Sequence, residues 1–214
     1  MAELLEAGLD REAAERGASV AAHAHDEGGR MDPLTQLDQL APALAGVVSG
    51  IGRDDLGRPT PCNRFAVGDV LAHMVGGARQ FAAAFRGEAP PPDTDDDALD
   101  AFPSALGDLA SAVNAPGALE RTVATPFGDL PGETFARFVV LDGLVHGWDL
   151  ATATGQPYEP PDDLVAEVDA FARSILDPLR DGDTFGDSVE PTAGATPIER
   201  LAAFTGRRPL VDVR

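Results

Sequence analysis

The sequence contains no lysine: all 16 basic residues are arginine, against 36 acidic residues, which gives a formal net charge of −20. This absence excludes a Schiff-base lysine, a lysine general base and a P-loop lysine for a phosphate. The acidic balance argues against a nucleic-acid partner, because phosphate binding needs a basic surface that releases counterions. The same charge argues against an anionic membrane surface. No apolar run approaches the roughly 18 residues that span a bilayer, so we expect no membrane segment.

Cysteine and aromatic residues are also scarce. The single cysteine, Cys62, excludes an internal disulfide and a Cys-rich zinc ribbon, and it fits the reducing cytoplasm where we expect the protein. Aromatic residues make up 6% of the chain, so alanine, leucine and valine must fill the interior. With 43% hydrophobic residues and about one typical domain length, we expect one sizeable core.

The first thirty residues are polar and rich in acidic side chains. They lack an apolar stretch followed by a small-residue cleavage site, so they do not form a secretory signal. We predict that residues 1–30 are an N-terminal extension, with disorder as one interpretation, and that residues 31–214 form the domain. Asp32 is a good N-cap and Pro33 suits the first helical position, which places the start of the domain there.

Apolar residues recur at helical spacing in most of the remaining chain. The pattern predicts helices over about 33–50, 67–87, 98–114, 133–152, 162–179 and 197–204. Residues 88–97, with three prolines and several aspartates, are typical of a solvated loop. Thr122–Thr125 is β-prone and a turn-like stretch follows it, which indicates a short hairpin or irregular crossover. These elements predict an all-α four-helix bundle with a short β-like crossover and extra C-terminal helices.

Two histidines lie inside the predicted bundle, His73 and His146. Asp142 stands four residues before His146, so the two share a helix face. With His73 from a facing helix they offer three N/O ligands and leave a fourth position open, as in a catalytic zinc site. Apolar neighbours in the sequence make an unpaired Asp142 costly, which favours ligation over a simple ion pair. His23 and His25 lie in the extension and form a poorly preorganised pair, so we expect no metal there.

Four segments share the pattern of one known family: Pro59–Cys62, the helix in which His73 is followed by Met-Val-Gly-Gly, Asp142–Leu150 and Arg200–Pro209. They resemble the mycothiol-dependent maleylpyruvate isomerase family, and more narrowly its actinobacterial metal-binding subgroup with a DinB-like four-helix bundle. The resemblance covers about residues 31–209. It implies an all-α, DinB-like fold.

The resemblance also implies a metal and a reaction. The family holds its metal with a histidine on the second helix and an acidic residue four before a later histidine, roles that fall on His73, Asp142 and His146. The implied cofactors are a divalent metal, zinc first with nickel as an alternative, and mycothiol as thiol cosubstrate. The implied chemistry is thiol transfer to, or isomerisation of, an electrophilic small molecule.

The chain departs from the family pattern at three places. Asn63–Ala66 stands where relatives commonly have a tryptophan and a Thr cap, and because Ala66 has no side-chain oxygen we expect a less tightly held helix start. Asp142 replaces the glutamate of the isomerase, which shortens the reach by one methylene. We interpret residues 147–214 as bundle helix and tail, without the isomerase's separate C-terminal domain. The named isomerase activity is therefore less strongly implied than the metal.

Several other residues have a functional and a plain interpretation. We interpret Cys62 as a small buried residue rather than a nucleophile or fourth ligand. Asp149 is a candidate to orient an imidazole, and Trp148 is either a neighbour of the site or core filler. Three glycines are expected to permit close helix approach or a wider pocket, and three arginines are candidates to bind a substrate carboxylate: Gly76, Gly77, Gly147, Arg64, Arg79 and Arg137.

Three functions remain open from the sequence. The first is a metal-dependent enzyme that uses a low-molecular-weight thiol, as a transferase or isomerase. The second is a non-catalytic metal- or small-ligand-binding bundle, and the third is a plain helical homodimer without metal. In the first case the partners are a small-molecule thiol and an electrophile, with no nucleic acid and no membrane.

Overall fold

The helices of the chain follow the apolar periodicity closely. The computed structural model describes residues 30–62, 64–92, 94, 96–125, 128–180, 186–208 and 210. Over these residues the helices are α3 (Pro33–Ser49), α4 (Val67–Arg86), α5 (Ala98–Val113), α6 (Gly132–Thr154), α7 (Asp162–Ile175) and α8 (Pro197–Phe204), with short 3-10 turns η1 (Arg53–Asp55) and η2 (Asp177–Leu179). The predicted all-α class is confirmed. His23, His25, Asn63 and Phe127 lie outside the described residues, and the domain boundary at residue 31 stays a prediction.

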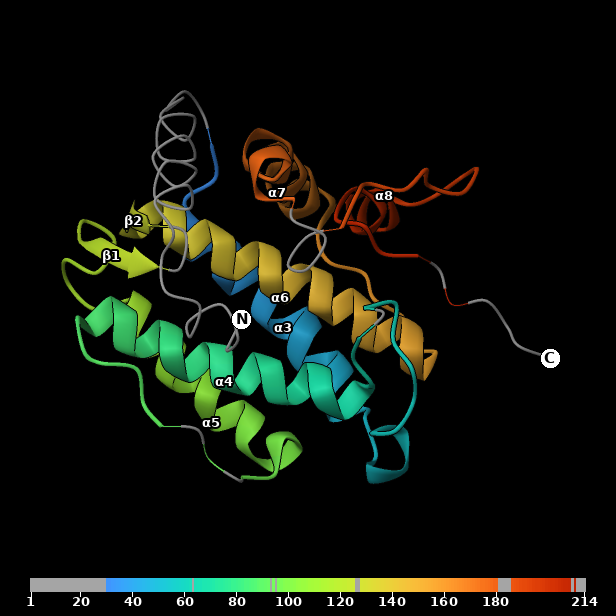
Figure 1. Cartoon of the computed structure of the whole chain (residues 1–214), viewed down its shortest axis with the longest axis horizontal. Helices are drawn as coiled ribbons and strands as arrows, with labels where there is room; N and C mark the ends of the chain where they lie inside the picture. The colour runs from blue at the N-terminus through green and yellow to red at the C-terminus, as the bar shows by residue number, and fades with distance from the viewer. Residues whose placement is uncertain are drawn as a thin grey trace.

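Four helices form the bundle (Figure 1). Helix α4 packs along α5, helix α3 packs along α6, and α4 meets α6 to close the two pairs around one core. Helices α7 and α8 cover the side of α6 that faces away from α4. The longest helix, α6, is therefore central, and it is buried along nearly its whole length. Any side chain on the α4 side of α6 faces another helix of the bundle.

A two-stranded hairpin connects α5 to α6, as the β-prone residues predict. Strand β1 (Thr122–Thr125) pairs antiparallel with β2 (Gly128–Pro131), with Thr122 opposite Pro131. Val123 and Leu130 face each other in the register and are both buried. The hairpin thus caps the end of the core at which α6 begins.

Local signals explain where the helices begin and end. Asp32 accepts a hydrogen bond from the Thr35 backbone N–H at 3.2 Å, next to Pro33 at the first helical position. Gly87 and Gly155 end α4 and α6 with φ values of 72° and 70°, which a residue with a Cβ adopts at a cost. These boundaries agree with the predicted ones.

One predicted helix end needs correction. The fifth helix is shorter than the predicted 162–179: α7 ends at Ile175 and a 3-10 turn follows. Pro178 explains the difference, because its ring lacks an N–H and collides with the carbonyl four residues earlier in a continuing α-helix.

The start of α4 is better held than Ala66 alone suggests. The Ala66 backbone N–H donates to the Asp69 carboxylate at 2.9 Å. The next two backbone N–H groups, of Val67 and Gly68, donate to the carbonyls of Arg58 and Leu56. The expectation of a loosely held start was therefore wrong: the preceding loop and the Asp69 side chain satisfy the N–H groups of Ala66, Val67 and Gly68.

A capping oxygen at Ala66 should still add stability. Ala66 has the extended backbone of an N-cap and no side-chain cap hydrogen bond. We expect Ala66→Thr to raise the free energy of unfolding by about 1 kcal/mol, because threonine can accept from the Asp69 N–H. Urea denaturation measures this, with Ala110→Thr on the exposed face of α5 as a control expected to lose a few tenths of a kcal/mol. A threonine at position 66 that leaves the urea midpoint at or below that of the wild type would contradict the expectation.

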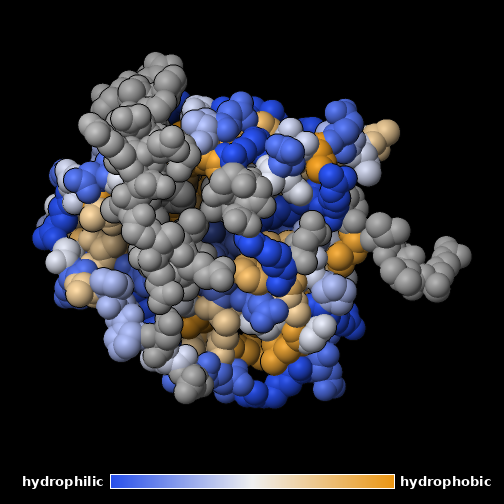
Figure 2. Space-filling model, in the orientation of Figure 1, coloured by the Kyte–Doolittle hydropathy of each residue, from blue (hydrophilic) through white to orange (hydrophobic). Residues whose placement is uncertain are grey.

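The surface of the described residues is largely polar. Hydrophilic residues cover much of the face in Figure 2, with apolar residues between them in smaller groups. Leu210 is the one large apolar side chain of the described part that is exposed. Over the same residues, no helix combines the length and apolar character of a membrane span.

Candidate metal centre

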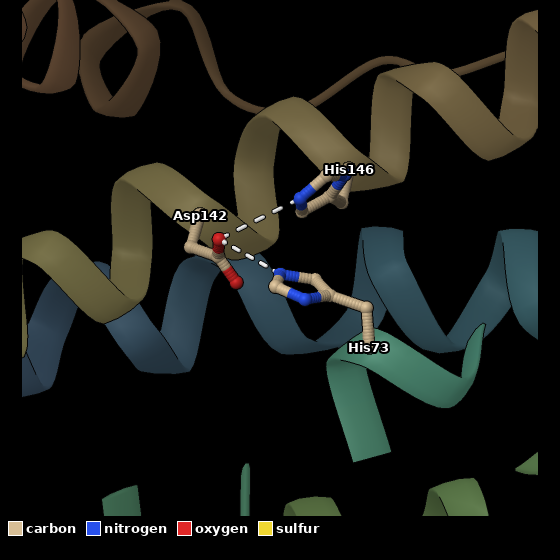
Figure 3. A group of neighbouring side chains, drawn as sticks. All are labelled: His73, Asp142 and His146. Carbon is tan, nitrogen blue, oxygen red and sulfur yellow. Dashed lines mark ion pairs between the residues drawn. The ribbon is translucent and has the colours of Figure 1, made fainter. Parts of the chain in front are cut away.

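Three side chains from two helices meet between α4 and α6 (Figure 3). His73 comes from α4, while Asp142 and His146 lie one turn apart on α6. His73 Nε2 lies 3.5 Å from Asp142 Oδ1, and His146 Nε2 lies 3.6 Å from the same oxygen. One ligating atom of each residue lies within 4.8 Å of the other two. The structure therefore brings together the three residues that the sequence predicts as metal ligands.

The donor separations fit a divalent metal. Zinc bound to nitrogen and oxygen at about 2.0–2.1 Å in a tetrahedral site holds its ligand atoms roughly 3.3 Å apart. The observed 3.5 and 3.6 Å are close to that spacing. A charge-assisted hydrogen bond between the same groups would be shorter, at about 2.7–2.9 Å. The three donors are thus arranged around a common point rather than bonded tightly to one another.

The three side chains differ in exposure, and Asp142 is more exposed than its apolar neighbours in the sequence predict. His146 and His73 are 6% and 13% exposed, but the Asp142 side chain is 28% exposed. The apolar residues next to Asp142 in the sequence do not enclose it, because successive residues on a helix point about 100° apart. Leu141 and Leu144 face the core instead. The site is therefore closed behind His146 and accessible on the Asp142 side.

The charges around Asp142 keep it ionised. Removal from water raises the pKa of its carboxyl, but the imidazoles of His146 and His73 and the Arg207 guanidinium outweigh that effect. The pKa of Asp142 consequently lies well below its usual range. Asp142 thus presents the carboxylate form, which is the form that ligates a metal.

Asp149 contacts His146 at the ring nitrogen that faces away from Asp142. Its Oδ2 lies 3.0 Å from His146 Nδ1, and the Asp149 side chain is fully buried. Arg207 Nε donates to the same oxygen at 3.4 Å, from the segment after α8. Asp149 therefore lies where the sequence interpretation put it, against an imidazole. Trp148 is partly buried against the core, which favours its interpretation as filler.

Two aromatic rings lie beside His73, those of Phe65 and His146. The Phe65 ring lies 5.7 Å from the His73 ring between centroids, and the His146 ring lies 4.9 Å from it in an edge-on arrangement. Phe65 belongs to the loop that precedes α4. Phe65 thus places an aromatic ring beside His73.

Two of the three arginines proposed for substrate binding pair with carboxylates of the chain, and the role of the third, Arg64, stays a prediction. Arg79 pairs with Asp96 at 2.7 Å, and the buried Arg137 pairs with Glu133 at 3.0 Å. Arg64 lies on the surface. Arg207, which sequence reasoning missed, contacts Asp149 and acts through its charge on Asp142. No spacing rule connects it to Asp149, because the two are 58 residues apart.

Cys62 keeps its plain interpretation. The thiol is half-buried, and its removal from water raises its pKa, with the Arg207 guanidinium acting in the opposite direction. Within the described part of the chain, the metal-competent group consists of His73, Asp142 and His146 without Cys62. A thiol with a raised pKa is a poor nucleophile and ligand, since the thiolate is the reactive form.

The three glycines singled out in the sequence differ in how close their neighbours are. At Gly147 an added Cβ would lie 2.5 Å from Tyr158 Oη, and this hydroxyl donates to the Leu144 carbonyl at 3.1 Å. Gly147 thus permits a close approach, but by the Tyr158 side chain from the loop between α6 and α7 and not by another helix. Gly77 would make only ordinary contact with Phe81, and Gly76 faces open space. For these two the close-approach interpretation was wrong.

Comparison with known proteins agrees with this geometry. The sequence model of the family described as the mycothiol maleylpyruvate isomerase N-terminal domain matches residues 37–151, a range that includes all three candidate ligands. Two proteins of Mycobacterium tuberculosis, from strains CDC 1551 and H37Rv and both described as uncharacterized, are each 34% identical over 179 residues. Each alignment covers 83% of this chain and 98% of the relative. No solved structure matches the chain.

Proposed function

The chain belongs to the family of the mycothiol maleylpyruvate isomerase N-terminal domain, and from that premise we propose that His73, Asp142 and His146 bind one divalent metal and that the site activates a low-molecular-weight thiol. Family membership and the observed helices confirm the DinB-like, all-α bundle. The observation that carries the proposal is the approach of the three ligating atoms to within 4.8 Å of one another.

The donor set suits zinc. Two imidazoles and one carboxylate form the three-ligand arrangement of catalytic zinc sites, which leaves a position open for a substrate. Nickel is the alternative, because imidazole also suits that ion. A 2+ ion and one carboxylate leave a net site charge of 2 − 1 = +1. Such a charge attracts an anionic ligand.

The proposed chemistry of the site is the activation of a thiol. When bound, a divalent ion supplies positive charge that lowers the pKa of an incoming thiol, so that a thiolate nucleophile is present near neutral pH. The largely buried side chains of His73 and His146 close one side of the site. Asp142 is more exposed, so a thiol reaches the site from the Asp142 side. Mycothiol is the thiol that the family description suggests. We propose thiol transfer to, or isomerisation of, an electrophilic small molecule in the reducing cytoplasm.

The engaged arginines favour a second candidate, a non-catalytic metal- or small-ligand-binding bundle. Arg79 and Arg137 each pair with a carboxylate of the chain itself. These pairs compete with a substrate carboxylate for both guanidinium groups. A bundle of this kind binds the metal and the thiol but does not catalyse a reaction of the thiol.

Thiol consumption separates the two candidates. Metal-loaded protein is incubated with mycothiol or glutathione and a panel of electrophiles, and the free thiol is followed with time. We expect turnover that falls by about 100-fold or more in His73→Gln, because the loss of one ligand disables the centre that activates the thiol. Glu133→Gln, which alters a surface carboxylate on the same helix α6, is the matched control. Tight binding of metal and thiol without turnover would favour the non-catalytic bundle.

A further inference from the structure

The contact between Asp149 and Arg207 connects the C-terminal segment to the candidate metal centre. Asp149 belongs to α6 and is fully buried, and Arg207 follows α8 and is 11% exposed. One carboxylate oxygen, Asp149 Oδ2, faces both His146 Nδ1 at 3.0 Å and Arg207 Nε at 3.4 Å. The other oxygen, Oδ1, is buried and has no hydrogen-bond partner among the described residues. A single oxygen of the Asp149 carboxylate therefore contacts both His146 and Arg207.

This arrangement determines which nitrogen of His146 faces the site. A carboxylate paired with an arginine can only accept hydrogen bonds, so the His146 nitrogen beside it carries the proton. The other nitrogen, Nε2, is then unprotonated, and it is the atom that lies 3.6 Å from Asp142 Oδ1. An imidazole ligates a metal through its unprotonated nitrogen, and the bond at the opposite nitrogen sets the tautomer.

We propose that Asp149 and Arg207 are positioning residues that hold His146 as its Nδ1–H tautomer, with Nε2 directed to the metal. Arg207 orients the Asp149 carboxylate and balances its buried charge, so the segment after α8 is part of the metal centre. The function of this pair rests on the proposed metal site. Its effect on the tautomer of His146 exists without a metal and is measured separately.

Long-range ¹H–¹⁵N correlation spectra of the metal-free protein test the tautomer directly. The spectra are recorded over a range of alkaline pH, and the tautomer is assigned where the His146 signals no longer change with pH. The signals of His146 are identified by their loss in His146→Gln. We expect the Nδ1–H tautomer in the wild type and a shift toward Nε2–H in Asp149→Leu. Asp149→Asn should retain Nδ1–H, because the amide oxygen can accept from both donors while the NH₂ takes the position of the unpartnered Oδ1.

Metal affinity provides the second readout. We expect Asp149→Leu to weaken zinc binding about 10- to 100-fold, the usual effect of removing a partner of a ligating histidine. Because that variant leaves Arg207 without its paired carboxylate, the double variant Asp149→Leu/Arg207→Met is measured beside it, since it removes both charges of the pair. Arg207→Met alone should weaken binding less than Asp149→Leu. Arg137→Met, which breaks another ion pair of α6, is the matched control and should bind as the wild type does.

The outcomes distinguish the inference from the proposed function. A wild type that binds no divalent metal overturns the proposed function, while the tautomer spectra still decide the role of Asp149. A wild type that binds zinc, together with an Asp149→Leu/Arg207→Met double variant that keeps the Nδ1–H tautomer and wild-type affinity, overturns the positioning role. Arg207→Met with wild-type zinc affinity and an unchanged His146 spectrum removes Arg207 from the pair.

Discussion

His73→Gln is expected to lower the divalent metal bound to the purified protein from about one equivalent to below a tenth of an equivalent. The physical reason is the loss of one of three ligands at a site where His73 provides the donor from α4 and the other two come from α6. Glutamine resembles histidine in size but its amide is a weak ligand for zinc. Elemental analysis after dialysis against the metal measures the loss.

The same variant removes the stabilisation that metal gives to the fold. A ligand that binds only the folded state at 100 times its Kd adds about 2.7 kcal/mol to the free energy of unfolding. Zinc should therefore raise the Tm of the wild type and leave that of His73→Gln unchanged. Asp142→Asn and His146→Gln should behave alike, and Glu133→Gln on the same helix should keep the wild-type response. Metal content below about a tenth of an equivalent in the wild type, or content unchanged by His73→Gln, would remove the basis for a metal centre.

The second large effect is expected at the start of α6. Gly132 is the first residue of that helix, and its backbone N–H donates to the Arg121 carbonyl at 2.7 Å. A Cβ at this position would lie 2.5 Å from the Ala118 carbonyl oxygen and 2.8 Å from that of Leu119. These atoms are backbone, which cannot rotate away as the end of a side chain can. Gly132→Ala must therefore displace either the loop or the helix that carries two of the candidate metal ligands.

We expect Gly132→Ala to lower the free energy of unfolding by about 3 kcal/mol, toward the upper end of overpacking costs. Urea denaturation of the metal-free protein measures it. Gly107 of α5 is exposed, and a Cβ added to it would meet nothing within 4 Å, so Gly107→Ala should instead stabilise the protein by about 1 kcal/mol through helix propensity. A Gly132→Ala variant as stable as the wild type would show that the loop adjusts freely, in conflict with the packing described above.

Much of the candidate site could be predicted from local patterns. Asp142 and His146 share a face of α6 because four residues make about one helical turn, and this relation needs no tertiary information. The place of His73 opposite them was a hypothesis, which the family resemblance strengthened, because spacing along one helix does not place a residue of another. The exposure of Asp142 was not predictable from its neighbours, since Leu141 and Leu144 on the same helix point into the core.

Other features depend on segments that are far apart in the sequence. Arg207 reaches Asp149 across 58 residues, and its approach follows from the packing of α8 on α6. The hydrogen bonds that hold the start of α4 come from the backbone carbonyls of Leu56 and Arg58, where the sequence showed only the missing cap of Ala66. The tight fit of Gly132 likewise depends on the loop at Ala118 and Leu119.

The absence of lysine and of clustered cysteines determined by itself which chemistry the protein lacks, and it left imidazole and carboxylate as the ligands for a metal. The apolar period and the capping residues determined the helices, because both act within a few residues along the chain. The tertiary structure decided which side of Asp142 meets solvent, and which buried carboxylate and arginine support His146. These are contacts between distant segments, and they exist only when the helices pack on one another.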